Sequence, residues 1–134
     1  MIVEDDTKTS EVLKTCYTKI FTDFFIKNGI PIKENTINIQ LIIKGSIAVE
    51  KCRNEKFDII SLDFNLNLTA DYDSEGNLKE DSITDGRTVL GVAHDNKTCR
   101  GMAIVSGIQS DETIEWIDNK NKDIQVIILS PTRE

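Results

Sequence analysis

The chain has 134 residues, which is enough for one domain with its own hydrophobic core and too few for two. Its formal net charge of −7 argues against direct nucleic-acid binding and favours a solvated surface or a cation site. No apolar run approaches the length of a bilayer span, and acidic residues follow Met1-Ile2-Val3 directly. We therefore expect one domain over residues 1–134, without a membrane span or signal peptide.

The three cysteines predict reduced thiols in a cytoplasmic protein. Cys16, Cys52 and Cys99 are odd in number and widely spaced, without a CxxC pair. This spacing favours neither a disulfide framework nor a zinc site. We expect Cys16 and Cys52 to lie on the inner faces of helices, as small core residues.

The first half of the chain alternates apolar strands with amphipathic helices. Expected elements are a strand at 1–3, a helix after 7–10 that Asn28-Gly29 stops, a strand at 36–44, a helix at 47–53 and a strand at 57–63. In the long helix, apolar residues recur at three- and four-residue spacing and predict a wide core-facing stripe. They are Val12, Leu13, Cys16, Tyr17, Ile20, Phe21, Phe24 and Phe25. In the second helix we expect Ile47, Ala48 and Cys52 to face inward.

The second half continues the alternation after a polar interruption. Residues 67–84 have no strand or helix period and predict a surface loop that turns at 74–77. Asp85-Gly86 ends this stretch, and Val89, Leu90, Val92 and Ala93 then predict a helix that runs to about Lys97. A further helix is expected over 111–119, where Ser110 could be the cap, and strands are expected over 101–106 and 123–129. Strands that alternate with helices predict an α/β three-layer sandwich with a five-stranded parallel sheet. A final helix after the last strand is missing from the pattern.

Chemically useful groups follow three of the expected strands. They are Glu4-Asp5-Asp6 after the first strand, Asp63 at the end of the third and Ser106 at the end of the fourth. The carboxyl ends of parallel strands meet at one edge of a sheet, where α/β proteins place their ligands. Clustered carboxylates repel one another unless a cation lies among them, and oxygen ligands suit Mg²⁺. A magnesium site beside Asp63 is therefore expected.

Taken together, these segments resemble the receiver domain of two-component response regulators, a flavodoxin-like fold. The matching segments are IVEDD at 2–6, FDIISLDFNL at 57–66, TDGRTVL at 84–90, AIVSG at 103–107 and VIILSP at 126–131. They occur in order and span the chain. The resemblance implies a self-modifying signalling module in a phosphorelay, rather than an enzyme that acts on a diffusible substrate.

The same resemblance implies a role for each strand-end residue. Asp5 would bind Mg²⁺ directly, Glu4 would assist through water, and the backbone carbonyl of Asn65 would complete the metal shell with Asp63. Asp63 would be the phospho-acceptor that attacks a phosphohistidine on a histidine kinase or phosphotransfer protein. Ser106 would be the hydroxyl that contacts the phosphoryl group. Asp6 would be a spare acid or a helix cap.

Several positions depart from the receiver pattern. Ser130 stands where receivers carry a phosphate-contacting lysine, Ile127 replaces a common aromatic residue, and Asn67 replaces a common proline. Serine cannot supply the charge of the lysine, although Arg133 or a lysine from elsewhere is a candidate substitute. The loop at 67–84 is longer than usual. A degenerate pseudo-receiver that binds partners without phosphorylation is therefore the alternative, and an effector domain or a second copy of the chain is a further possible partner.

Two further resemblances suggest alternative functions. Asp71, Asp73 and Glu75 resemble the first half of a calcium-binding loop, but Ser82 occupies the position of its bidentate glutamate. Asp63 also resembles the nucleophile of haloacid-dehalogenase-type phosphatases. That family needs a second acid two residues later, where this chain has Asn65, an amide that cannot protonate a leaving group.

Overall fold

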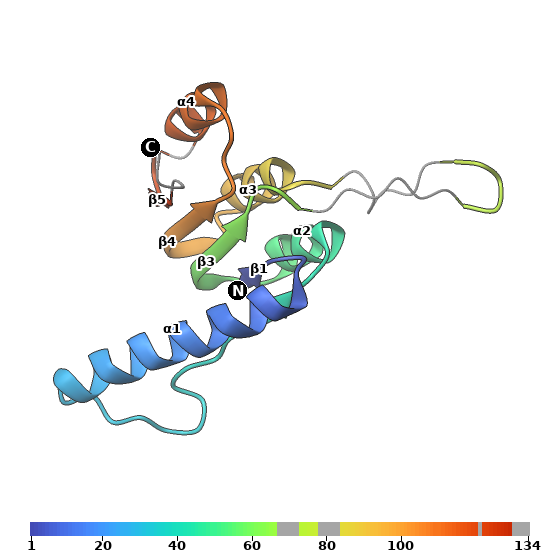
Figure 1. Cartoon of the computed structure of the whole chain (residues 1–134). Helices are drawn as coiled ribbons and strands as arrows, with labels where there is room; N and C mark the ends of the chain where they lie inside the picture. Colours follow the sequence, from blue (N-terminus) through green and yellow to red (C-terminus); the bar gives the residue numbers. More distant parts are fainter. Residues whose placement is uncertain (67–72, 78–83, 121, 130–134) are drawn as a thin grey trace.

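The computed structural model describes residues 1–66, 73–77, 84–120 and 122–129. Five strands alternate with four helices along these residues (Figure 1). The strands are β1 (Ile2–Val3), β2 (Leu41–Ile42), β3 (Phe57–Asp63), β4 (Cys99–Ser106) and β5 (Gln125–Ile128). The helices are α1 (Thr7–Lys27), α2 (Gly45–Asn54), α3 (Gly86–Asp95) and α4 (Asp111–Lys120). None of these four helices is long and apolar enough to cross a membrane.

The strands form one parallel sheet in the order β2-β1-β3-β4-β5. The longest paired stretch joins β3 to β4, where Ile60 lies opposite Ala103 and Asp63 lies opposite Ser106. This order and the flanking helices are the flavodoxin-like α/β arrangement that the sequence predicts. Within the described part of the chain, no helix follows β5.

The hydrophobic core lies on the side of the sheet that α2, α3 and α4 cover. Alternate residues of β3 and β4 point to this side, because successive side chains of a strand face opposite ways. They are buried with residues of the three helices, namely Ile60, Leu62, Ala103 and Val105 with Ala48, Val89, Leu90 and Ile117. The hydroxyl of Thr98 donates to the backbone carbonyl of Cys52, which ties the start of β4 to α2.

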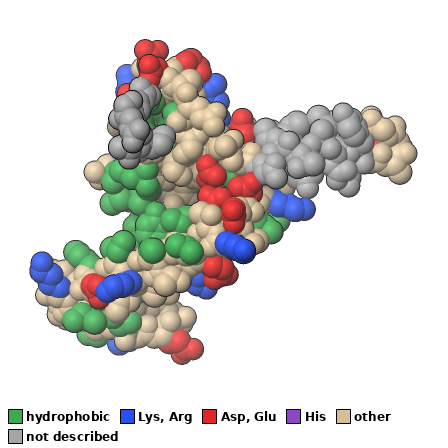
Figure 2. Space-filling view, in the orientation of Figure 1, with side chains coloured by type: hydrophobic (Ala, Val, Ile, Leu, Met, Phe, Trp, Pro, Cys, Tyr) green, Lys and Arg blue, Asp and Glu red, His purple; other side chains and the backbone are tan. Residues whose placement is uncertain are grey.

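The other side of the sheet is covered less completely, and here the expected helix stripe is partly wrong. Tyr17 and Ser61 join α1 to β3 through hydrogen-bonded hydroxyls 3.0 Å apart. Ile20 and Phe24, however, are 58% and 56% exposed, and Val12 and Cys16 are exposed as well. Helical periodicity identifies an apolar stripe but does not say how much of it meets a neighbour. Hydrophobic side chains consequently remain visible along α1 and on the sheet above it (Figure 2).

A smaller correction concerns the inner face of α2. Ala48 and Cys52 are buried as expected, but Ile47 is 42% exposed and Val49 takes its place in the core. The buried stripe therefore keeps two of its three predicted residues and has Val49 in place of Ile47. In an α-helix the residues 48, 49 and 52 share one face at three- and four-residue spacing, so the correction is consistent with helical geometry.

The second strand is much shorter than the sequence predicts. The apolar run at 36–44 yields only Leu41–Ile42 as strand, because β2 is an edge strand whose sole neighbour, β1, is itself two residues long. Backbone groups outside that register have no ladder to join. β5 is likewise shorter than the expected 123–129, while β4 begins two residues before the expected 101.

The loop at 67–84 is described only in part. Its expected turn is confirmed at 73–77, where Asp73 Oδ1 accepts the backbone N–H groups of Glu75 and Asn77, both at 2.9 Å. The other residues of the calcium-loop pattern, together with Asn67, Ser130 and Arg133, lie outside the described residues. The predictions that rest on them stay predictions.

Candidate functional site

Three carboxylates meet at the carboxyl edge of the sheet. Glu4 and Asp5 directly follow β1, and Asp63 is the last residue of β3. Because β1 and β3 pair in parallel, with Val3 opposite Leu62, their ends coincide. One carboxylate oxygen from each of the three residues lies within 4.8 Å of the others, and acidic side chains gather visibly at this point (Figure 2). We call these three residues the acidic cluster.

Glu4 is the buried member of the acidic cluster, with 8% of its surface exposed. The pKa of Glu4 is raised from 4.5 to about 7. Burial is the largest cause, the neighbouring carboxylates of Asp63 and Asp5 act in the same direction, and a hydrogen bond from the Asp6 backbone N–H opposes the rise. That N–H lies 3.2 Å from Glu4 Oε1. The ionised cluster is therefore electrostatically unfavourable by itself, and a bound cation would lower its free energy.

Backbone groups fix the position of Asp63. The N–H of Asn65 donates to Asp63 Oδ1 at 2.9 Å, and the N–H of Phe64 donates to the backbone carbonyl of Ser106 at 2.8 Å. Gly107, with φ +73°, passes so close that a Cβ there would overlap Asp63 Oδ1. Gly86 at the start of α3 has the same relation to the backbone of Phe64. The Asp63 carboxylate is thus held by neighbouring backbone on two sides.

The remaining candidate residues differ in how far the structure tests their expected roles. Ser106 ends β4 directly opposite Asp63 in the register and is half-buried. Asp6 caps α1, because its Oδ1 accepts the N–H groups of Lys8 at 2.9 Å and Thr9 at 3.2 Å, which confirms one of its two expected roles. The metal-binding roles of Glu4, Asp5, Asp63 and the Asn65 carbonyl remain predictions. The acceptor role of Asp63 and the phosphoryl contact of Ser106 also remain predictions.

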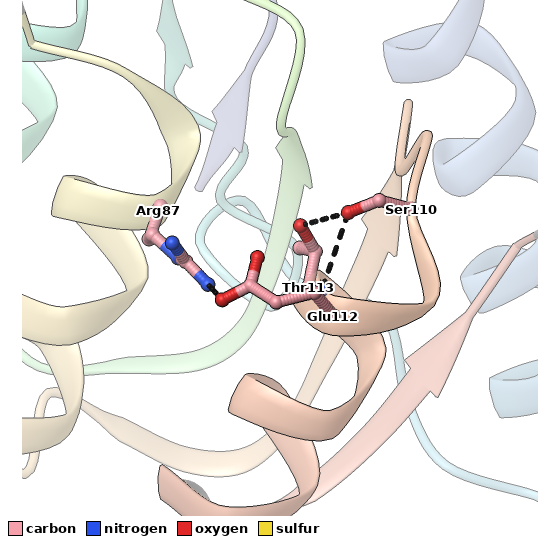
Figure 3. Close-up of polar contacts among 4 residues, drawn as sticks. All are labelled: Arg87, Ser110, Glu112 and Thr113. Atoms are coloured by element: carbon pink, nitrogen blue, oxygen red, sulfur yellow. Dashed lines mark hydrogen bonds and ion pairs between the residues drawn. The ribbon is translucent and has the colours of Figure 1, made fainter.

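A groove of about 500 Å³ lies beside Asp63, between the ends of β3 and β4 and the starts of α3 and α4. Its lining includes Asn65, Gly107, Arg87, Ser110 and Thr113. Ser110 Oγ and Thr113 Oγ1 lie 2.9 Å apart, and Ser110 Oγ also accepts the Thr113 N–H at 3.3 Å, so the expected cap of α4 is present (Figure 3).

Arg87 of α3 reaches across this groove to α4. Its Nη2 lies 2.8 Å from Glu112 Oε1, and its guanidinium carbon lies 4.8 Å from the centre of the Trp116 ring (Figure 3 shows the ion pair). We call Arg87, Glu112 and Trp116 the Arg87 cluster. Sequence reasoning missed this cluster and the close approach of Gly107. A glycine directly after the apolar strand at 101–106 could have indicated a close approach of the backbone at Gly107. No feature of the sequence indicated that Arg87 pairs with Glu112.

Comparisons with known proteins leave the family open. No protein-family model matches the chain, and a search of curated proteins finds no match. The features that point to a function are therefore the fold, the acidic cluster and the motifs that resemble receiver domains.

Proposed function

We propose that the chain is a receiver-type phosphoacceptor domain that takes a phosphoryl group on Asp63 from a histidine kinase or phosphotransfer protein. The observation that carries the proposal is the meeting of Asp63 with Glu4 and Asp5 at the carboxyl edge of a flavodoxin-like sheet. In such sheets this edge is the ligand side. A carboxylate at a strand end, held by backbone and flanked by further acids, suits transfer of a phosphoryl group assisted by a cation.

The proposed reaction uses the carboxylate of Asp63 as nucleophile. The Asn65 N–H holds Oδ1, and the other oxygen, Oδ2, forms a bond to phosphorus. The bond between phosphorus and the imidazole nitrogen of the phosphohistidine breaks, and the imidazole leaves with the electron pair and takes up a proton. The product is an acyl phosphate on Asp63, with no net oxidation or reduction.

The acidic cluster fits Mg²⁺ by its chemistry. It offers three carboxylates within 4.8 Å, and one of them is a buried glutamate with a raised pKa. Asp5 and Asp63 would hold the ion, with the Asn65 carbonyl as a further ligand and Glu4 acting through water. When bound, the ion supplies positive charge that offsets the carboxylates and the incoming phosphoryl oxygens.

Ser106 is the proposed contact for the phosphoryl group. Its place opposite Asp63 in the register puts its side chain on the same side of the sheet as the acceptor. Its hydroxyl would donate to a phosphoryl oxygen, and the half-buried setting would strengthen that hydrogen bond. The proposed location is the cytoplasm, where a kinase would supply the phosphoryl group.

The test is phosphoryl incorporation from acetyl phosphate, with and without Mg²⁺, followed by intact mass under mildly acidic conditions. In this reaction the bridging P–O bond of acetyl phosphate breaks and acetate leaves. A Mg²⁺-dependent adduct is expected on the wild type and is expected to vanish in Asp63→Asn. The matched control is Asp58→Asn, an exposed carboxylate near the other end of β3, which should label like the wild type.

The alternative is a pseudo-receiver that binds a partner without phosphorylation. The serine at position 130, where receivers carry lysine, favours this alternative. Absence of a Mg²⁺-dependent adduct on the wild type would contradict the phosphoacceptor proposal, and absence of Mg²⁺ binding as well would leave the alternative in its place.

A further inference from the structure

Arg87 is the basic residue among those described in the lining of the groove beside Asp63. It is the second residue of α3, whose first turn is fixed because Asp85 Oδ1 accepts the N–H and the hydroxyl of Thr88 at 2.9 and 2.8 Å. The same groove is lined by Asn65 and Gly107. Both of these residues adjoin Asp63 Oδ1. A long cationic side chain thus shares a groove with the immediate neighbours of the acceptor.

The contacts of Arg87 leave one of its donors unused. Nη2 pairs with Glu112, and the guanidinium lies over Trp116. Nε is buried and has no hydrogen-bond partner within the described part of the structure. A buried donor without a partner is unfavourable. A second arrangement in which more N–H groups of the guanidinium form hydrogen bonds would therefore be lower in free energy.

The present partners hold Arg87 weakly. The side chains of Arg87 and Glu112 are 38% and 72% exposed, and ion pairs at such positions are screened by water and salt. A phosphoryl group on Asp63 would carry a larger negative charge than Glu112. Guanidinium binds phosphate oxygens through two parallel hydrogen bonds, which is its preferred geometry.

We propose that Arg87 binds the phosphoryl group on Asp63 and, in doing so, leaves Glu112 and Trp116 of α4. This inference rests on the proposed function, because it needs a phosphoryl group on Asp63. Arg87 would supply the positive charge that Ser130 does not. Phosphorylation would then release the tie between α3 and α4 that Arg87 forms with Glu112 and Trp116.

The chain offers a direct probe of this movement. Trp116 is its single tryptophan, so intrinsic fluorescence reports on the ring that Arg87 covers. We would add acetyl phosphate and Mg²⁺ and follow fluorescence and intact mass in parallel. The wild type should show a fluorescence change that develops with the mass adduct, and Asp63→Asn should show neither.

Variants of Arg87 separate this inference from the proposed function. In Arg87→Ala we expect labelling about tenfold slower or an adduct about tenfold shorter-lived, the scale of one lost charge-assisted hydrogen bond, with no fluorescence step. Arg87→Lys keeps the positive charge but not the two parallel N–H donors. Its labelling rate or adduct lifetime should lie between those of the wild type and Arg87→Ala. Arg100→Ala, an exposed arginine near the start of β4, is the control and should match the wild type.

Glu112→Gln supplies a second measurement that does not depend on removing Arg87. It should leave labelling intact and move the fluorescence of the unlabelled protein toward that of the labelled wild type. An adduct that forms, persists and changes fluorescence equally in wild type and Arg87→Ala would overturn the inference and leave the proposed function standing. No adduct on the wild type would overturn both.

Discussion

The acidic cluster contains Asp63, the Arg87 cluster includes a residue that lines the groove beside it, and the two clusters differ in their electrostatics. The acidic cluster joins like charges around a buried glutamate, whereas the Arg87 cluster joins opposite charges at a partly exposed position. Like charges in a buried setting store unfavourable free energy that a bound cation would release. An exposed ion pair contributes little and is easily exchanged. The acidic cluster is therefore the part that would gain free energy from binding a cation, whereas the Arg87–Glu112 contact is the part that can be exchanged easily.

The largest expected effect comes from Glu4→Gln, which removes the buried charge. The pKa of Glu4 is raised from 4.5 to about 7. The unfolded chain therefore binds fewer protons between these values, and stability falls as pH rises through this window. Without Mg²⁺ at pH 8, Glu4→Gln should raise the free energy of unfolding by up to about 3 kcal/mol. Urea unfolding at several pH values, in the presence of a chelator, measures it.

The control for this prediction is Glu11→Gln, an exposed acid on α1. It should change stability by no more than about 0.5 kcal/mol at any of these pH values. A constant difference between Glu4→Gln and the wild type from pH 5 to pH 8 would contradict the buried-charge account. Added Mg²⁺ should stabilise the wild type more at pH 8 than at pH 5, because protons compete for Glu4.

Gly107→Ala should have the next largest effect, because Gly107 lies against Asp63 of the acidic cluster and also lines the groove that Arg87 lines. An added Cβ would overlap Asp63 Oδ1, and the φ of +73° disfavours residues with side chains. We expect a loss of about 2 kcal/mol in the free energy of unfolding, together with weaker Mg²⁺ binding. Chemical denaturation and calorimetric titration with Mg²⁺ measure the two effects.

Gly91→Ala is the matched control within α3. There an added Cβ would lie 3.9 Å from the Trp116 ring, an ordinary contact, in the interior of the helix. Alanine at such a place should stabilise the protein by up to about 1 kcal/mol. Equal losses in the two variants would show that the close approach of Gly107 to Asp63 has no special importance.

Asp85→Ala tests the Arg87 side alone. Removal of the cap should lower the free energy of unfolding by about 1 kcal/mol, because the Thr88 N–H loses its acceptor at the start of α3. Mg²⁺ affinity should remain unchanged, since the acidic cluster is untouched. Asp118→Ala, on the exposed side of α4, serves as the control for a lost surface charge. A Mg²⁺ affinity that falls with the cap would show that the two sides are not independent.

The smallest expected effect is that of the ion pair itself. A double-mutant cycle with Arg87→Ala and Glu112→Gln should give a coupling free energy below about 1 kcal/mol, because Glu112 is 72% exposed and Arg87 is 38% exposed. Thermal or urea unfolding of the four proteins measures it. A coupling above about 2 kcal/mol would mean that Arg87 is held too firmly to exchange partners as we propose.

Much of the fold followed from local patterns. The bounds of β3, Phe57–Asp63, were predicted correctly, because a continuous apolar run bounded by polar residues suits a central strand with neighbours on both sides. The extent of β2 was not predictable in the same way. An edge strand extends only as far as its neighbour, and no local pattern reveals that the short first strand is the neighbour of the run at 36–44.

The candidate site divides in the same manner. Glu4, Asp5 and Asp63 could be expected together, since each follows a strand of a parallel sheet and strand ends share an edge. The contact of Gly107 with Asp63 and the pairing of Arg87 with Glu112 arise between segments remote in sequence. Their residue types occur at many surface positions, so composition and spacing could not distinguish them.

The sequence by itself determined the order of strands and helices, the parallel sheet and the edge at which its acids collect. Periodicity and strand-end position depend on neighbours along the chain, and these are fixed by covalent order. The tertiary structure decided which apolar stripe is buried, how long the edge strand is, how strongly Glu4 resists ionisation and which groups surround Asp63. Each of these depends on the distance and solvent exposure of atoms far apart in sequence, which only packing in three dimensions sets.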